Sequence, residues 1–272
     1  MIRYWSDRQA DSGSVHCFGN GNFMIYATGP ILSQIQGPPY TMPSFCSLSP
    51  VGEEDSELFC ESVRESGSNI WLHRISGGKQ ATFTDYMLPD SNVFFRDFSS
   101  SVLTLSVNVM PWLCKRVYRD FAFGDIRCDL LSVRVPMGTN FFTNIAVEQE
   151  TWMLLTVQGG HITDDGNVQL AGDGRVIISA GLLPDAAGAM TQALKMKSDE
   201  ALTQVHNYWR GFLAGVTDLG ARLPADRVSP KLLQKVTQAC ESIAIVIKCQ
   251  QSTSGGVQAG QPLIHFGTCR KR

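Results

Sequence analysis

The sequence lacks every segment that would place the protein in or across a membrane. Its longest uninterrupted apolar run, Ile243 to Ile247, is far shorter than the roughly 18 residues that a membrane-spanning helix needs. The N-terminus is polar and has no apolar core of a signal peptide, and no Asn-x-Ser/Thr sequon occurs. We therefore expect a cytoplasmic protein with no membrane partner.

The sequence also has no large excess of positive or negative charge. The 272 residues carry 23 Lys+Arg and 25 Asp+Glu, which gives a net charge of −2. No segment gathers the positive charge that a nucleic-acid partner requires, so nucleic acid is not expected to bind. Hydrophobic residues make up 43% of the chain, which is typical of a packed globular protein.

Motifs for cofactors, metals and nucleophilic catalysis are absent as well. The sequence has no G-x-S-x-G, Walker A, H-E-x-x-H or C-x-x-C pattern, and its histidines have no metal-ligand spacing. We expect no cofactor and no metal site, and we expect reduced, buried cysteines. The residues concerned are Cys17, Cys46, Cys60, Cys114, Cys128, Cys240, Cys249 and Cys269, with His16, His73, His161, His206 and His265.

The carboxylates do not predict a catalytic pair. The acidic run Glu53-Glu54-Asp55 with Glu57 is typical of a solvated loop. Asp85 stands at a strand end, and we interpret it, like Glu148 and Glu150, as structural. No residue of the chain is assigned a catalytic role.

What the sequence has in abundance is strand patterns. Residues 103–109 alternate Leu103, Leu105, Val107 and Val109 with polar residues, which predicts one buried face. In residues 126–135 the apolar set changes from even to odd numbers, which suggests a β-bulge. Residues 164–167 and 172–174 are typical of hairpin turns. Many strands and no helix before residue 198 predict an antiparallel sandwich over residues 1–195.

Two helices are expected after the strands. Ser198 is a candidate N-cap for a helix over 198–217, whose apolar positions are spaced to pack on the sandwich. Ser229-Pro230 begins a second helix that ends near residue 250 and is apolar on nearly every side in its second half. Glycine-rich residues 255–260 follow. The packing positions of the first helix are Leu202, Val205, Trp209 and Phe212.

Three segments, in this order along the chain, resemble glycoside hydrolase family 15, the glucoamylase-like six-hairpin glycosidases. The first runs from Gly19-Asn20-Gly21 through Gly29-Pro30 and Gln34 to Gly37-Pro38-Pro39-Tyr40 and is similar to the opening strands. The second, Tyr208-Trp209, resembles the linker helix. The third runs from Ile247 to Gly260 and resembles the end of the first barrel helix with the loop that enters the catalytic cavity.

The resemblance implies a mainly β fold: an antiparallel β-supersandwich followed by a linker helix and the first helix of a truncated (α/α)6 barrel. The expected divisions are residues 1–195, 196–228 and 229–272. The partner that it implies for the intact family is an α-glucan or an oligosaccharide. The substrate-loop positions carried over are Gly255, Gly256, Ala259, Gly260, His265 and Arg270.

The family hydrolyses α-glucosidic bonds with inversion, using one carboxylic acid and one carboxylate about 6.5–9.5 Å apart. Its members continue from the loop into a Tyr-Val-Arg-Asp segment, whereas residues 268–272 here read Thr-Cys-Arg-Lys-Arg. The family's two glutamates would lie beyond that segment. We therefore expect an inactive N-terminal portion, produced by a shifted frame, a retained intron or a gene-model fault.

Two alternatives stay open. One is the front of a related (α/α)6 disaccharide phosphorylase, which phosphate-binding residues outside this sequence would reveal. The other is a free-standing β-sandwich that binds carbohydrate or a protein. A binding module would not need the apolar helix at 229–250, and that helix, if uncovered, predicts self-association.

Overall fold

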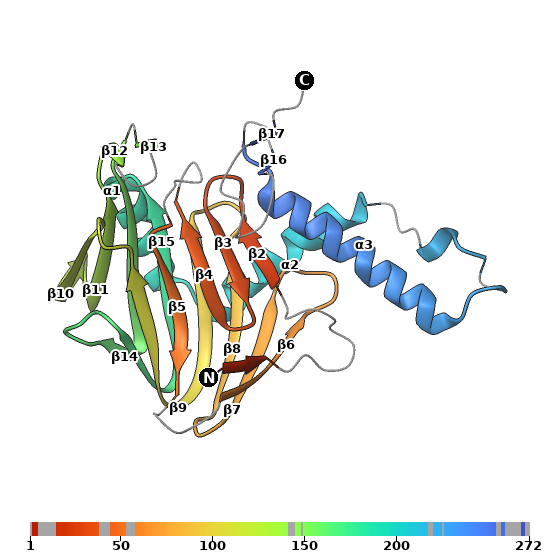
Figure 1. The fold of residues 1–272 in the computed structure, drawn as a ribbon, viewed down its shortest axis with the longest axis horizontal. Helices are drawn as coiled ribbons and strands as arrows, with labels where there is room; N and C mark the ends of the chain where they lie inside the picture. Colours follow the sequence, from red (N-terminus) through yellow and green to blue (C-terminus); the bar gives the residue numbers. More distant parts are fainter. Residues whose placement is uncertain are drawn as a thin grey trace.

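The computed structural model describes residues 2–4, 15–37, 44–52, 58–140, 145–147, 149–216, 220–224, 226–253, 257–258 and 268–269 (Figure 1). Strands up to β15 (Val168–Gly181) come first along the chain and helices follow them, as the sequence predicted, and two short strands come after the last helix. The strands are β1 (Ile2–Tyr4), β2 (Val15–Gly19), β3 (Met24–Thr28), β4 (Ile31–Gln36), β5 (Cys46–Val51), β6 (Leu58–Arg64), β7 (Trp71–Gly77), β8 (Ala81–Met87), β9 (Val93–Val109), β10 (Cys114–Phe123), β11 (Ile126–Val135), β12 (Gly138–Asn140), β13 (Ile145–Val147), β14 (Thr151–Ile162), β15 (Val168–Gly181), β16 (Val257–Gln258) and β17 (Thr268–Cys269).

One long strand joins the layers of the sandwich. The first part of β9 pairs with β8, and its last part, from Thr104 to Val109, pairs with β5, while β15 pairs along both parts. From β9 the sheet runs through β8, β7 and β6 to β1 on one side, and through β15, β14 and β11 to β10 on the other. A branch of β5, β4, β3 and β2 forms the facing layer. Within this sheet every described pairing is antiparallel except β1 with β6.

The interior of the sandwich is apolar, and the alternating residues fill it. Leu103, Leu105 and Val107 are buried in this core, and Val109 packs against it, as predicted. A second apolar cluster lies between the outer face of the sheet and the helices. Burying each such side chain contributes about 1.5–3 kcal/mol.

The predicted bulge within residues 126–135 was wrong. β11 pairs without interruption with β14 over Leu131–Val135. The extra residue lies on the neighbouring strand β10, where Tyr118 pairs with Leu130 but Phe121 pairs with Cys128. Ile126, Cys128 and Leu130 lie in the apolar cluster beneath the helices, whereas Leu131, Val133 and Val135 lie in the core of the sandwich. The change of apolar register therefore reflects burial on both faces of the strand.

The turn at residues 164–167 joins β14 and β15 as predicted, but residues 172–174 do not form a turn. They lie within β15, where Gly174 pairs with Phe98 of β9. A Cβ at Gly174 would overlap with the Gln158 carbonyl oxygen on β14. Glycine is needed there for close approach of two strands and not for chain reversal.

In the part of the chain that the structure describes, three α-helices and a short 3-10 helix, η1 (Gly220–Arg222), follow β15. The helix α1 (Leu183–Lys195) was not predicted, because the sequence placed the first helix at residue 198. The next, α2 (Ser198–Ala214), begins there, but its N-cap is Lys197. The Ser198 hydroxyl accepts a hydrogen bond from Arg175 of β15 instead of capping the helix. The last is α3 (Pro230–Gln250), which Ser229 caps through the Leu232 amide.

The helices differ in how far they are covered. In α2, Val205 and Trp209 are buried, and Leu202 and Phe212 pack on the same cluster, as predicted. The N-terminal half of α3 extends away from the sandwich (Figure 1). Among the residues that the structure describes, no helix is long and apolar enough to cross a membrane.

Candidate functional site

The loop positions predicted to contact a substrate lie outside the described residues. They are Gly255, Gly256, Ala259, Gly260, His265 and Arg270. Glu148 and the acidic run at 53–57 lie outside them too. The described residues nevertheless place the helix that precedes this loop.

The last turn of α3 packs directly on the β2–β3 hairpin. At Gly19 a side chain would overlap with the Cys249 carbonyl oxygen, so the two backbones touch. One turn further on, the Thr253 amide donates to the Gly21 carbonyl at 3.1 Å, and the Thr253 hydroxyl bonds Asn22 at 3.2 Å. Gly21 has φ +99, a conformation that favours glycine. Two segments that carry the family resemblance, although far apart in sequence, therefore meet in space.

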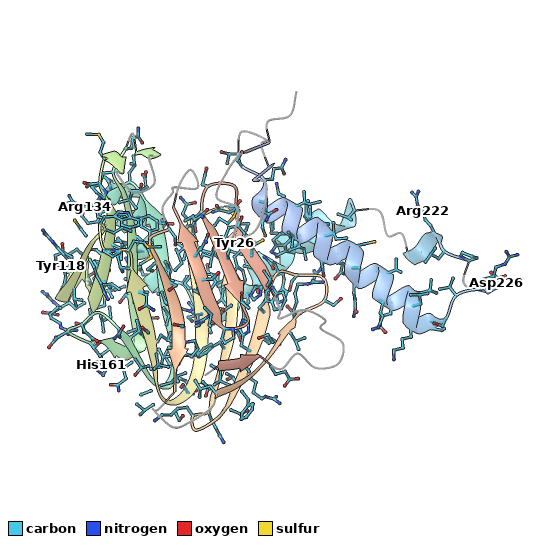
Figure 2. All side chains as sticks on the ribbon, in the orientation of Figure 1. Tyr26, Tyr118, Arg134, His161, Arg222 and Asp226 are labelled. Carbon is cyan, nitrogen blue, oxygen red and sulfur yellow. The ribbon has the colours of Figure 1, made fainter. Side chains whose placement is uncertain are left out.

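Buried polar groups support this junction. The Asn69 side-chain nitrogen donates to the Cys17 carbonyl at 3.0 Å and to the Cys249 sulfur at 3.3 Å. Tyr26 lies on β3 close to the same place (Figure 2). Burial, with a smaller contribution from the neighbouring thiol of Cys17, raises the pKa of Tyr26 to about 12, so it stays a neutral phenol. The end of α3 is thus anchored on the first hairpin by hydrogen bonds between neutral groups.

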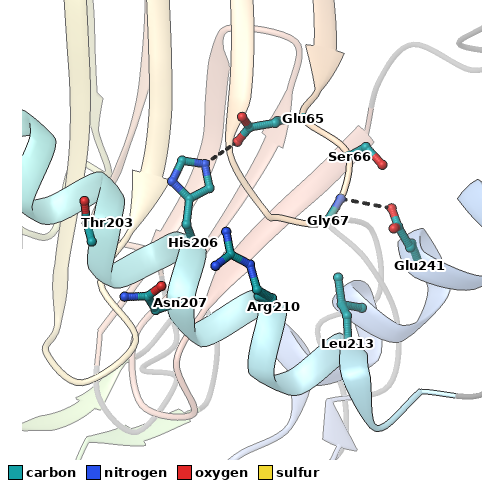
Figure 3. Close-up of a pocket in the computed structure, with 9 residues that line it drawn as sticks. All are labelled: Glu65, Ser66, Gly67, Thr203, His206, Asn207, Arg210, Leu213 and Glu241. Atoms are coloured by element: carbon teal, nitrogen blue, oxygen red, sulfur yellow. Dashed lines mark hydrogen bonds and ion pairs between the residues drawn. The ribbon is translucent and has the colours of Figure 1, made fainter.

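Beside this junction is a polar pocket of about 510 Å³ (Figure 3). It lies between α2, α3 and the turn that joins β6 to β7. The His206 Nε2 of α2 is 2.7 Å from Glu65 of the turn, and Ser68 donates to the same carboxylate at 2.9 Å. The pocket is lined by Glu65, Ser66, Gly67, Thr203, His206, Asn207, Arg210, Leu213 and Glu241.

The turn also holds α3. Glu241 accepts hydrogen bonds from the Gly67 amide at 3.3 Å and from Arg64 at 3.1 Å. Both carboxylates of the pocket are therefore engaged by groups of the chain itself. Among the described residues that line the pocket, the polar side chains outside these contacts include those of Ser66, Asn207 and Arg210, and the last two lie three residues apart on one face of α2.

The sequence did not point to this pocket. Glu65, His206 and Glu241 come from three distant parts of the chain and follow no motif. Each residue alone is typical of a solvated surface. Only the packing of α2 and α3 on one turn brings them together. The described residues contain no group of three or more His, Cys, Asp or Glu side chains placed to hold a metal ion.

A second polar group has the residue types of a catalytic triad but lies in the sandwich core. The Ser62 hydroxyl is 2.7 Å from His73 Nδ1, and His73 Nε2 is 3.4 Å from an Asp85 oxygen. Arg96 donates to both Asp85 oxygens at 2.8 and 2.6 Å. All four residues are buried, so no substrate reaches the hydroxyl. Asp85 is structural, as the sequence suggested.

Arg96 keeps the buried Asp85 carboxyl group of this cluster ionised. Burial by itself would raise the pKa of Asp85, but the Arg96 guanidinium outweighs it and holds the pKa at about 2. Asp85 is therefore ionised at neutral pH. The half-buried Glu150 is likewise paired, since its carboxylate accepts hydrogen bonds from Arg134 and from Trp152 at 2.9 Å each.

No protein-family model matches this sequence, and no curated protein matches it. Among solved structures, a bacterial glucoamylase crystallised with acarbose is similar, with a TM-score of 0.60 and 7% sequence identity. The similarity covers 88% of this chain and 41% of the glucoamylase chain. At that identity it shows the fold alone: the chain has a glucoamylase-like fold and spans about two-fifths of that enzyme's length.

Proposed function

We propose that this chain is the front portion of a glucoamylase-like glycoside hydrolase of family 15. In this proposal the sandwich and α2 form a scaffold, and α3 is the first helix of an (α/α)6 catalytic barrel. The observation that carries the proposal is the junction at Gly19 and Cys249. It joins two of the segments that resemble the family, within a fold similar to that of a bacterial glucoamylase.

The substrate in this proposal is an α-glucan or an oligosaccharide, as the acarbose-bound glucoamylase suggests. The anchored end of α3 would aim residues 255–260 at the catalytic cavity, with Gly255, Gly256, Ala259 and Gly260 in the loop and His265 and Arg270 beyond it. We assign none of these residues a catalytic role. Inverting hydrolysis needs an acid and a base carboxylate. The carboxylates of Asp85 and Glu150, and those of Glu65 and Glu241 in the pocket, are each engaged by groups of the chain itself.

The exposed apolar face of α3 also supports the proposal. Ile243 and Ile247 are 60% and 52% exposed, one turn apart on the same face. An apolar helical face of this kind packs on other helices when it is part of a bundle or barrel. The remaining barrel helices would supply that cover. Without them we propose that this face drives self-association.

A carbohydrate-binding module is the second candidate, and the pocket with Asn207 and Arg210 is the observation in its favour. Amide and guanidinium groups donate hydrogen bonds to sugar hydroxyls. Calorimetric titration with maltose, isomaltose and starch oligosaccharides separates the two candidates. The module binds a sugar through this pocket, and an Asn207→Ala variant loses that binding; the enzyme portion alone shows none.

The decisive experiment reads the genomic sequence downstream of the codon for residue 272 in all three frames. Our proposal expects a barrel with a Tyr-Val-Arg-Asp segment and two catalytic glutamates. The purified 272-residue chain should release no glucose from maltose, isomaltose or starch oligosaccharides, whereas its extension through that barrel should. DNA that encodes no barrel in any frame contradicts the proposal, and so does glucose release by the chain alone.

A further inference from the structure

Two cysteines from opposite ends of the chain meet where α3 ends. Cys17 lies on β2 and Cys249 in the last turn of α3, and the neighbouring Cys249 thiol helps to raise the pKa of the Cys17 thiol. One amide nitrogen, Asn69 Nδ2, contacts both residues, the Cys17 carbonyl at 3.0 Å and the Cys249 sulfur at 3.3 Å. Both cysteines are fully buried. One side-chain amide therefore contacts both cysteines, which come from separate elements.

The other buried thiols have different neighbours. The Cys46 sulfur contacts the Met153 thioether at 3.6 Å, and the Cys60 sulfur contacts the Ser62 hydroxyl at 3.7 Å. A methionine sulfur or a hydroxyl cannot form a disulfide. The backbone contact at Gly19 and the amide of Asn69 also fix Cys249 in its place over β2. Among these four buried cysteines, Cys17 and Cys249 are therefore the candidate pair for a disulfide.

We propose that Cys17 and Cys249 form a crosslinking site, at which oxidation by a low-molecular-weight disulfide joins α3 to β2. One protein thiol loses its proton, attacks a sulfur of the small disulfide and releases a thiol. The second protein thiol then loses its proton, attacks the mixed disulfide and releases another thiol. The two protein thiols lose two electrons, and the small disulfide gains them. This site does not rest on the proposed enzymatic role.

The crosslink would strengthen the attachment of α3 to the sandwich. Besides its last turn, α3 contacts the rest of the described chain through Glu241 at the β6–β7 turn, through Ile245 in the apolar cluster beneath the helices, and at η1. A disulfide between Cys17 and Cys249 closes nearly the whole chain into one loop, and such long loops give the largest constraint on the unfolded state. The helix would then stay docked whether or not its exposed face is covered.

Formation of the crosslink depends on local opening of α3 and on the redox conditions. The hydrogen bond to Cys249 and burial both raise the pKa of the Cys17 thiol well above its ordinary value, so little thiolate is present at neutral pH. The reaction therefore proceeds when the last turn of α3 opens locally and exposes the pair. Reducing conditions keep the pair as thiols, and an excess of small disulfide converts it.

The test uses the full chain, purified in reductant and then equilibrated with oxidised and reduced glutathione. Free thiols are blocked with N-ethylmaleimide, and the chain is digested without reduction and examined by mass spectrometry. We expect a linked peptide pair that contains Cys17 and Cys249, with Cys46 and Cys60 still free. The oxidised chain should melt roughly 5–10 °C above the reduced chain.

Two serine variants make the test specific. Cys249→Ser should abolish the linked pair and the rise in melting temperature, whereas Cys240→Ser, on the same helix, should keep both. Melting of each variant in reductant shows whether it folds. A second arm refolds the chain from denaturant in the oxidised buffer, so slow opening cannot hide the reaction. Free thiols at both positions in both arms, or preferential pairing with other cysteines, would overturn the proposal.

Discussion

Gly19 and Cys249 are in backbone contact: any side chain at residue 19 would occupy the position of the Cys249 carbonyl oxygen. This contact joins the first hairpin of the sandwich to the last turn of α3. It explains why glycine stands at residue 19 although the strand there has ordinary backbone geometry. Everything that follows α3 starts from this fixed point.

Asp85→Asn should lower the free energy of unfolding by about 3–5 kcal/mol, because it leaves the buried Arg96 guanidinium without its counter-charge. Chemical denaturation at pH 7 measures the loss. Asp173→Asn is the control, since Asp173 is exposed on β15 and should change stability by no more than about 0.5 kcal/mol. Equal effects of the two substitutions would show that the ion pair adds nothing.

The same pair predicts how stability depends on pH. The folded pKa of Asp85, about 2, lies below the unfolded value of about 3.9. Its contribution is therefore complete above about pH 4 and is lost as the pH falls towards 2. The difference in stability between the wild type and Asp85→Asn should shrink over that interval. A difference that stays constant from pH 5 to pH 2 would contradict the assignment.

Trp209→Ala should cost roughly 3–5 kcal/mol, since the indole is buried between α2 and the sheet and packs edge-on against Tyr208 and Phe212. The neighbouring Arg210→Ala is the control, because Arg210 lies on the exposed side of α2. Thermal melts of both variants give the comparison. An unchanged melting curve for Trp209→Ala would mean that α2 is loosely attached.

Self-association should depend on the exposed face of α3. We expect the wild-type chain to associate as its concentration rises, and Ile243→Lys with Ile247→Lys to abolish this. The double variant Gln234→Lys with Gln238→Lys adds the same charge to exposed positions of the same helix and should still associate. Sedimentation velocity measures all three. Deletion of residues 229–272 should raise solubility, and a monodisperse wild type would contradict the account.

The sandwich could be predicted from the sequence because its strands alternate plainly. Leu103, Leu105 and Val107 show period two, and that pattern sets both the strand and its buried face. β11 misled the prediction because helices cover its second face, and period two is lost when both faces are apolar. α1 was missed because Pro184 and Gly188 are interpreted as the end of the strands and not as part of a helix, although Ala186, Met190 and Ala193 recur at helical spacing and Pro184 stands in the first turn, where proline is tolerated.

The candidate site could not be predicted in the same way. The contact of Gly19 with Cys249, and of His206 with Glu65, depends on how helices dock on hairpins far away in sequence. From the sequence alone, Gly19 is interpreted as a turn residue, because its contact with Cys249 is not visible there. The resemblance named the two segments that meet there, but not their contact.

The docking of α3 on the first hairpin is central to the proposed role of the chain, and Gly19→Ala tests it directly. The added methyl group should displace the last turn of α3, at a cost of about 1–3 kcal/mol. Gly211→Ala is the matched control, because nothing lies near that position in α2 and alanine should stabilise the helix by about 1 kcal/mol. The measurement is the rate at which iodoacetamide modifies Cys249 under native, reducing conditions. We predict slow modification in the wild type and in Gly211→Ala, and modification at least tenfold faster in Gly19→Ala. Fast modification in the wild type, or equal rates in all three proteins, would contradict the docking of α3 on the first hairpin.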